Sequence, residues 1–150
     1  MPFWSTAESR QGRGCMTKVQ QEYFADQFVR KDLRERVLHE MSKKPDRFEW
    51  RLCHDVHGMI DEKAIVFGGD KLNEAQAIAQ LKKYTREGNG FLVFCARDGE
   101  IVLIEEGVEA CFVSGGGSAF VMDKVALFKE EYFFGSPDKF IVLASSARKG

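Results

Sequence analysis

The sequence lacks the features that would place it in a membrane, in a secretory pathway or on nucleic acid. No apolar run approaches the roughly 20 residues needed to span a bilayer. Residues 1–15 do not have the basic stretch followed by an apolar one that is typical of a secretory signal. The 22 basic and 23 acidic residues leave a net charge of −1, which argues against a dedicated nucleic-acid or anionic-membrane binder.

Paired cysteine spacing is also absent. The four cysteines are scattered along the chain: Cys15, Cys53, Cys95 and Cys111. We therefore predict reduced thiols in a cytoplasmic protein. The 150 residues are 44% hydrophobic, which suits a globular domain with a real core and no structural metal or cofactor. We predict a flexible N-terminal extension over residues 1–15 and a single domain over residues 16–150.

The most informative stretch that is present runs over residues 91–106. Asp98-Gly99, a pair typical of a two-residue hairpin turn, divides it into two apolar arms. With that turn, Val93 would lie opposite Ile104. Both arms are apolar on both faces, so the hairpin is predicted to lie inside a sheet that is covered on both sides.

Strands and helices are predicted along the rest of the chain in mixed order. Helices are predicted over residues 17–41, 73–88 and 123–134. Strands are predicted over residues 48–54, 64–67, the two hairpin arms, 108–113, 120–122 and 140–144. Thr17 and Asn73 each precede a glutamine by three residues, the pattern of a capping box. The fold class is therefore α+β, a single domain with a mainly antiparallel sheet of five to seven strands and about three helices.

The first predicted helix has more apolar surface than one contact requires. Phe24, Phe28 and Leu38 form a second stripe, turned away from the first. A helix that only covers a sheet needs one stripe. The second would meet another helix, the N-terminal Phe3 and Trp4, or a second copy of the chain, so these three residues are candidate interface residues.

The densest group of reactive side chains lies in residues 53–57. One interpretation is a zinc site built on Cys53, His54 and His57 and completed by Cys95, Cys111 or His39. Another makes Cys53 a nucleophile with either histidine as its base. The third is a polar loop without a role. The spacing matches no strong zinc pattern and neighbouring side chains in an extended segment diverge, so we favour the polar loop and predict no metal.

A second polar segment, residues 114–118, has the sequence SGGGS. It predicts a flexible connector, and the alternatives are an oxyanion-binding nest or a mobile flap. Around Trp50, basic and aromatic residues are interleaved as in nucleic-acid binders. Acidic residues dilute that patch almost one for one, so nucleic acid is not the favoured partner.

Three hypotheses for function remain. The favoured one is a small non-enzymatic interaction protein of the immunity, inhibitor or adaptor type, whose partner is another protein or a second copy. The second is a small-ligand module with a pocket lined by Trp50, Phe94 and Tyr132. The third is a hydrolase or transferase that uses residues 53–57. The first is favoured because no catalytic set converges in the sequence.

Overall fold

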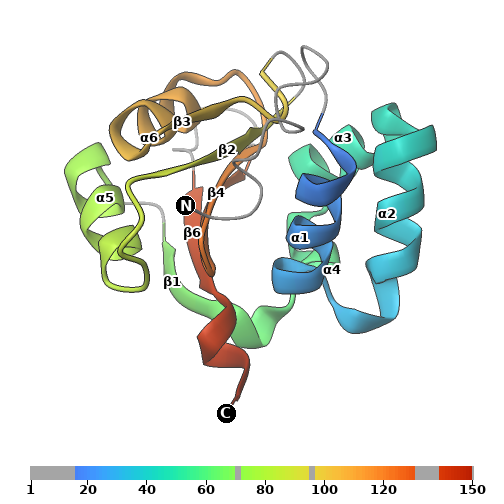
Figure 1. The fold of residues 1–150 in the computed structure, drawn as a ribbon, viewed down its shortest axis with the longest axis horizontal. Coiled ribbons are helices and arrows are strands. Elements are labelled where there is room, and N and C mark those ends of the chain that lie inside the picture. Colours follow the sequence, from blue (N-terminus) through green and yellow to red (C-terminus); the bar gives the residue numbers. More distant parts are fainter. Residues whose placement is uncertain (1–15, 70–71, 95–96, 131–138, 150) are drawn as a thin grey trace.

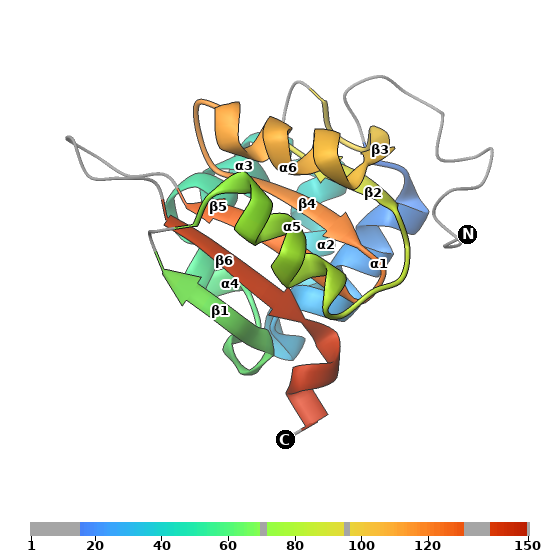
Figure 2. The same cartoon turned by 90° about the vertical axis from the view of Figure 1, so that its left-hand side faces the viewer.

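The computed structural model describes residues 16–69, 72–94, 97–130 and 139–149. Its strands form one six-stranded antiparallel sheet in the order β1-β6-β5-β4-β2-β3. Helices cover both faces of this sheet (Figures 1 and 2). The predicted α+β class with a mainly antiparallel sheet is confirmed, although the described residues form six α-helices rather than about three. The predicted extension over residues 1–15 lies outside the described part of the chain.

The elements follow one another as two blocks. The first block covers one face of the sheet and consists of α1 (Lys18–Phe28), the 3-10 helix η3 (Lys31–Leu33), α2 (Arg34–Lys43), α3 (Pro45–His54), α4 (Val56–Met59) and η4 (Glu62–Ala64). The second block consists of β1 (Ile65–Gly69), α5 (Glu74–Lys82), β2 (Asn89–Val93), β3 (Ile101–Leu103), α6 (Ile104–Val113), β4 (Ser118–Met122), β5 (Val125–Glu130), β6 (Lys139–Ala144) and η5 (Ser145–Lys149). Helices α5 and α6 cover the opposite face (Figure 1).

Both predicted capping boxes are present. Thr17 Oγ1 accepts a hydrogen bond from the Gln20 backbone N–H at 3.1 Å, and the Gln20 side chain accepts one from the Thr17 N–H at 2.9 Å. Asn73 and Gln76 make the same two bonds at 2.8 and 2.9 Å. These reciprocal bonds satisfy backbone donors that have no partner within the helix, which explains why α1 and α5 begin where the sequence predicts.

The single helix predicted over residues 17–41 is wrong, because the chain breaks into α1 and α2. At the break, Val29 pairs with Ile60 in an isolated antiparallel bridge. The Arg30 N–H donates to the Met59 carbonyl at 2.9 Å instead of continuing the helical ladder. Val29 is β-branched and fully buried, a residue type that fits an extended backbone better than a helix interior. The bridge between Val29 and Ile60, which are distant in sequence, therefore decides where α1 ends.

The strand predicted over residues 48–54 is also wrong, since this segment is helix α3. Phe48 and Leu52 face the core together because residues four apart lie on the same side of a helix. Pro45 occupies the first turn of α3, where its missing N–H carries no penalty. Trp50, which an alternating strand would have placed beside them, is 49% exposed.

Two further segments have the opposite secondary structure from the one predicted. Residues 108–113, predicted as a strand, belong to α6, and residues 125–130, predicted as part of a helix, form β5. Every residue from Val125 to Phe128 is fully buried, because β5 is covered on both faces. Such a strand shows no apolar and polar alternation, so its pattern resembles a helix. The predicted helical residues 131–134 lie outside the described residues.

The central hairpin forms with a register different from the predicted one. Phe91 lies opposite Ile101, whereas a two-residue turn requires Val93 opposite Ile104. Gly99 has a positive φ of 84°, but the preceding aspartate does not, and the predicted turn needs both. A wider loop replaces it. β3 also lies at the sheet edge, so the interior placement is wrong for this strand, whereas coverage of both sheet faces is correct.

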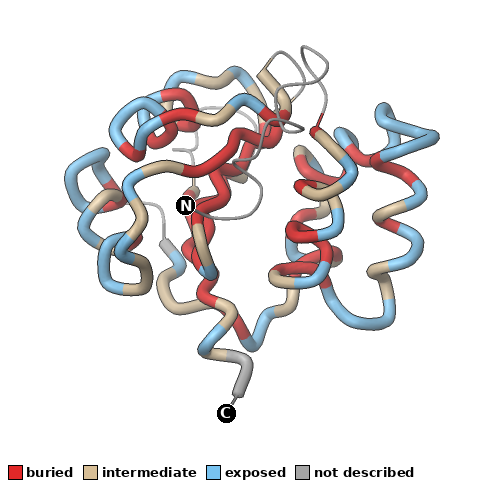
Figure 3. The backbone as a smooth tube through the Cα atoms, in the orientation of Figure 1, coloured by how far each residue is buried: buried red, intermediate tan, exposed pale blue. Residues whose placement is uncertain are grey.

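The core consists of two apolar clusters, one on each face of the sheet. Beneath α1 to α4, the ring centroid of Phe24 lies 5.8 Å from that of Phe48 and 5.9 Å from that of Phe128. Beneath α5 and α6, Leu92 and Phe120 are fully buried. Buried residues follow the strands and the inner sides of the helices, while the outer side of α2 is largely exposed (Figure 3). Each cluster therefore packs against one face of the same sheet.

Candidate functional site

Two of the three candidate interface residues lie in the core. Phe24 and Phe28 are both 0% exposed, and their rings pack against Phe128 of β5. The second apolar stripe of α1 is therefore covered by the sheet of the same chain. This burial removes the argument that Phe24 and Phe28 contact a second copy.

Leu38, the third candidate, lies in an open groove on the outer side of the helical layer. The groove has a volume of about 570 Å³. It is lined by Val19, Glu22, Tyr23, Ala25, Asp26 and Gln27 of α1 and by Arg34 and Leu38 of α2. We call it the α1–α2 groove. Because α1 and α2 are separate helices, residues of both can line its walls, which one continuous helix would not permit.

The groove has an apolar interior and a charged rim. Tyr23 and Ala25 are buried at its floor, and Val19 and Leu38 are half-buried. Glu22 is exposed, and among the described residues its carboxylate forms no ion pair. The lining therefore combines an apolar floor with a charged rim, and Glu22 is an acidic rim residue that no ion pair among the described residues offsets.

The groove is also lined by one positively charged side chain, that of Arg34. Arg34 Nη1 lies 3.8 Å from Asp26 Oδ1, and Arg34 Nε donates to the Val29 carbonyl at 3.3 Å. The guanidinium is thus held against its own chain, and it offsets the charge of Asp26. Glu22, one helical turn before Asp26, makes no such ion pair within the described residues.

The floor of the groove is attached to the sheet. The Tyr23 hydroxyl donates to Asp123 Oδ1 at 3.2 Å and accepts from the Lys124 N–H at 2.8 Å. Burial raises the pKa of Tyr23 above its ordinary value, so the phenol stays neutral and keeps its proton for Asp123. These two bonds fix the position of the Tyr23 ring at the floor of the groove.

The residues predicted to line a ligand pocket do not come together. Trp50 lies on the outer side of α3, where the Arg47 guanidinium sits 5.6 Å from its ring centroid. Phe94 packs against the apolar cluster under α5 and α6, on the opposite face of the sheet. Tyr132 lies outside the described residues. The described residues therefore give no pocket shared by Trp50 and Phe94.

The catalytic candidates lie at the junction of α3 and α4. Cys53 and His54 end α3, and the His54 ring centroid lies 5.7 Å from that of Trp50. His57 belongs to α4, and its Nε2 lies 3.0 Å from Oε1 of Glu130. An imidazole beside a carboxylate can act as a base, but the partner of His57 here is neither a thiol nor a hydroxyl.

The structure brings the two predicted polar segments together, which the sequence does not indicate. Gly117 approaches the end of α3 so closely that a Cβ there would lie 2.3 Å from the Leu52 carbonyl oxygen. Ser114 and Ser118 lie with their hydroxyl oxygens 3.0 Å apart. Lys129, 4% exposed, donates to the Ser114 carbonyl near the end of α6. This is a side chain capping a helix terminus, and it explains the buried lysine structurally.

The other candidate metal ligands are dispersed. His39 is exposed on α2, and Cys111 is buried in α6 on the opposite face of the sheet. Burial raises the pKa of Cys111 to about 12, so its thiol stays protonated near neutral pH. Within the part of the chain that the structure describes, no three His, Cys, Asp or Glu side chains are grouped to hold a metal ion. Cys95 lies outside the described residues.

Comparison with known proteins identifies no relative. No protein family, curated protein or solved structure matches this chain. The described helices include none with the length and apolar character required to cross a bilayer. The functional argument therefore rests on the α1–α2 groove and on the chemistry of its lining.

Proposed function

We propose that this protein is a non-enzymatic interaction module, and that the α1–α2 groove binds a short amphipathic segment of another protein. The segment carries one or two apolar anchors and a lysine or arginine. The observation that carries the proposal is an open apolar groove with the exposed carboxylate of Glu22 at its edge. We also propose a cytoplasmic location, which the thiols of Cys53 and Cys111 support.

The apolar part of the groove supports binding of a side chain rather than of an ion. Val19 and Leu38 remain half-buried, and the buried ring of Tyr23 lies between them and the sheet. Grooves formed by neighbouring helices receive the apolar positions of amphipathic segments. The groove volume of about 570 Å³ lies within the roughly 300–1,000 Å³ that is typical of ligand-binding clefts.

The charge of the groove selects the partner. Glu22 and Asp26 stand four residues apart on α1, a spacing at which like charges repel by a few tenths of a kcal/mol. Arg34 offsets the charge of Asp26 only. A cation brought by the partner would relieve the repulsion and form the missing ion pair with Glu22. A basic segment is therefore favoured over an acidic one.

The other two hypotheses have less geometric support. Trp50 and Phe94 lie on different sides of the molecule, so they do not define one ligand pocket. The His57 imidazole contacts the carboxylate of Glu130, which orients the ring without supplying a nucleophile. The interaction hypothesis needs neither arrangement.

A titration with model peptides tests the proposal. The probe is an amphipathic peptide of leucine and lysine, about 14 residues long so that it can form a helix. Its leucine and glutamate counterpart is the charge control. Binding to the isotope-labelled full chain is followed by amide NMR shifts. We expect saturable shifts at residues 19–27 and 34–38 with the lysine peptide alone.

Two variants locate the binding and its charge dependence. Glu22→Lys should weaken binding of the lysine peptide about tenfold, because an attraction becomes a repulsion. Glu109→Lys makes the same charge change at an exposed position on α6 and should leave the affinity unchanged. The proposal is wrong if the lysine peptide does not bind, if its shifts lie outside the groove, or if both variants weaken binding equally.

A further inference from the structure

The loop between β2 and β3 is attached to the first turns of α1. The Gln20 side-chain amide donates to the Gly99 carbonyl at 2.9 Å, and this bond is buried. The Met16 backbone N–H donates to the Asp98 carboxylate. Gln20 is itself 0% exposed. Two hydrogen bonds from the start of α1 therefore end on neighbouring residues of the loop, and they join the helical layer to the edge of the sheet.

The Asp98 carboxylate is poorly compensated in this position. Its Oδ1 is buried and has no hydrogen-bond partner within the described residues. The Met16 and Phe94 backbone N–H groups are the donors that face it, and Glu49 of α3 faces it with a like charge. Burial and Glu49 raise the pKa of Asp98 to about 7.

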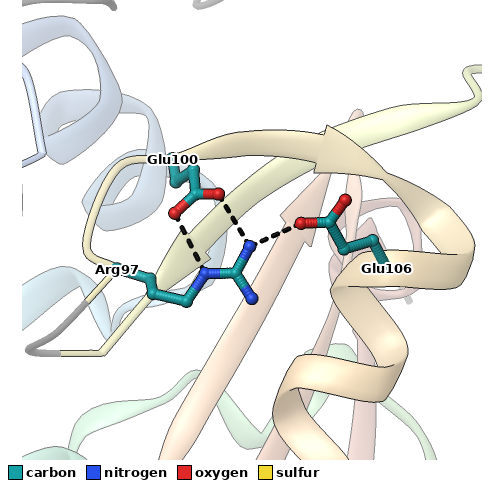
Figure 4. Close-up of polar contacts among 3 residues, drawn as sticks. All are labelled: Arg97, Glu100 and Glu106. Carbon is teal, nitrogen blue, oxygen red and sulfur yellow. Dashed lines mark hydrogen bonds and ion pairs between the residues drawn. The ribbon is translucent and has the colours of Figure 1, made fainter.

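The nearest loop cation is engaged elsewhere. Arg97 makes two bonds to Glu100, at 3.0 and 2.7 Å, and a third to Glu106 at the start of α6 (Figure 4). These pairs tie the guanidinium to the α6 side of the loop. No ion pair compensates the Asp98 carboxylate among the described residues. Its charged form is therefore opposed from α3 and is balanced by backbone donors only.

We propose that residues 97–100 form a proton-controlled latch on α1, which is closed when Asp98 is protonated and loosens when Asp98 ionises. A protonated carboxyl gives its buried site a neutral group and removes the repulsion from Glu49. Ionisation leaves a buried charge whose solvation improves when the loop separates from α1. The proposal concerns the coupling between the helical layer and the sheet and does not depend on the α1–α2 groove.

The direction of the pH effect follows from linkage. The pKa of Asp98 is about 7 in the closed state, whereas in the open state it is the ordinary value of about 3.9. The closed state therefore binds more protons than the open state between these values. The population of the open state should rise about tenfold per pH unit up to about pH 7 and level off above it.

Hydrogen exchange of the full chain, followed by mass spectrometry from about pH 5 to about pH 8.5, measures the opening. After correction for intrinsic exchange rates, protection of residues 16–24 should fall about a hundredfold between about pH 5 and about pH 7 and then remain constant. Asp98→Asn should remove this dependence, because the amide stays neutral at every pH. Protection of β5 and β6 should not follow the same curve.

A second variant keeps the test decisive if Asp98→Asn does not fold. Glu49→Gln removes the facing carboxylate and should move the plateau to lower pH, whereas Glu109→Gln on α6 should not move it. The latch is refuted if protection of residues 16–24 does not change with pH, if Asp98→Asn retains the dependence, or if Glu49→Gln and Glu109→Gln have the same curve as the wild type.

Discussion

A buried ion pair between α2 and α3 provides the sharpest test of how the helical layer is held together. Arg51 Nε lies 2.6 Å from Glu40 Oε1, and Arg51 Nη2 lies 3.1 Å from Glu40 Oε2. The two residues are 7% and 5% exposed. Glu40→Met would leave the guanidinium buried without its counter-charge, so we expect a loss of about 3 kcal/mol in the free energy of unfolding. Arg51→Met should lose a similar amount for the same reason.

The double variant separates the strength of the pair from the cost of breaking it. Glu40→Met/Arg51→Met replaces the two buried charged side chains with two apolar ones. Because desolvation offsets most of the attraction in a buried pair, replacing both partners is often close to neutral. We expect the double variant to be less destabilised than either single variant, by about 1 kcal/mol or less relative to wild type.

Urea unfolding followed by circular dichroism measures these differences, provided that the slope with denaturant is the same in all variants. Asp32→Ala is the control, because the Arg30–Asp32 pair is exposed at 46% and 66% and should contribute less than about 0.5 kcal/mol. The reasoning is refuted if Glu40→Met behaves like Asp32→Ala, or if the double variant loses the sum of the two single losses.

The ion pair between Glu40 and Arg51 also predicts how the free energy of unfolding changes at acidic pH. The Arg51 hydrogen bond holds the pKa of Glu40 below its ordinary value of 4.5. A carboxylate with a lowered pKa contributes stability that is fully present above the ordinary value and is lost as the pH falls toward the lowered one. Wild type should therefore lose stability below about pH 4.5 more steeply than Glu40→Met, which urea titrations at several pH values would show.

Two further predictions test the packing. Gly107→Ala would place a Cβ 2.2 Å from the ring of buried Phe120, so it should lower the free energy of unfolding by about 2 kcal/mol despite the better helix propensity of alanine. Gly115→Ala is the control and should be neutral, because nothing lies within 4 Å of a Cβ at that position. Thermal unfolding compares the two variants, and equal effects would contradict the packing. Phe24→Glu/Phe28→Glu should unfold the chain rather than yield a folded monomer, and a folded, monodisperse protein by circular dichroism and light scattering would contradict their burial.

Local signals in the sequence are sufficient to predict the starts of α1 and α5. Thr17 and Asn73 form their capping boxes within four residues, so no distant contact is needed to place α1 and α5. The predicted strand over residues 140–144 also agrees with β6, Lys139–Ala144. These elements were predictable because short-range chemistry and tertiary packing favour the same structure.

Distant contacts decided the elements that the sequence did not predict. The bridge between Val29 and Ile60 divides a helix that periodicity alone would continue. The bond from Gln20 to Gly99 joins the hairpin loop to α1, and the observed loop is wider than the local Asp98-Gly99 pair predicts. A sheet covered on both faces also removes the alternation by which strands are normally recognised.

The candidate groove could be predicted only in part. The sequence indicates Leu38 as a candidate interface residue, but its neighbours in the groove, Val19 and Tyr23, come from α1. The groove exists because the chain turns back after Val29, and no local pattern placed that break. The repulsive spacing of Glu22 and Asp26 beside Val19 was the one available signal. Arg51 was similarly hidden, since in the sequence it is one of many basic residues near Trp50.

The strand order has a consequence for the way this chain is made. β1 has β6 as its neighbour in the sheet, although α5, α6 and four other strands lie between them in the sequence. β1 therefore remains without a pairing partner during synthesis until β6 has been translated. Part of the surface that α1 to α4 cover, including Ile141 and Leu143, also comes from β6. We expect the sheet to close late and slowly, as pairings between distant segments do. Until it closes, α1 to α4 lack part of the strand surface against which they pack.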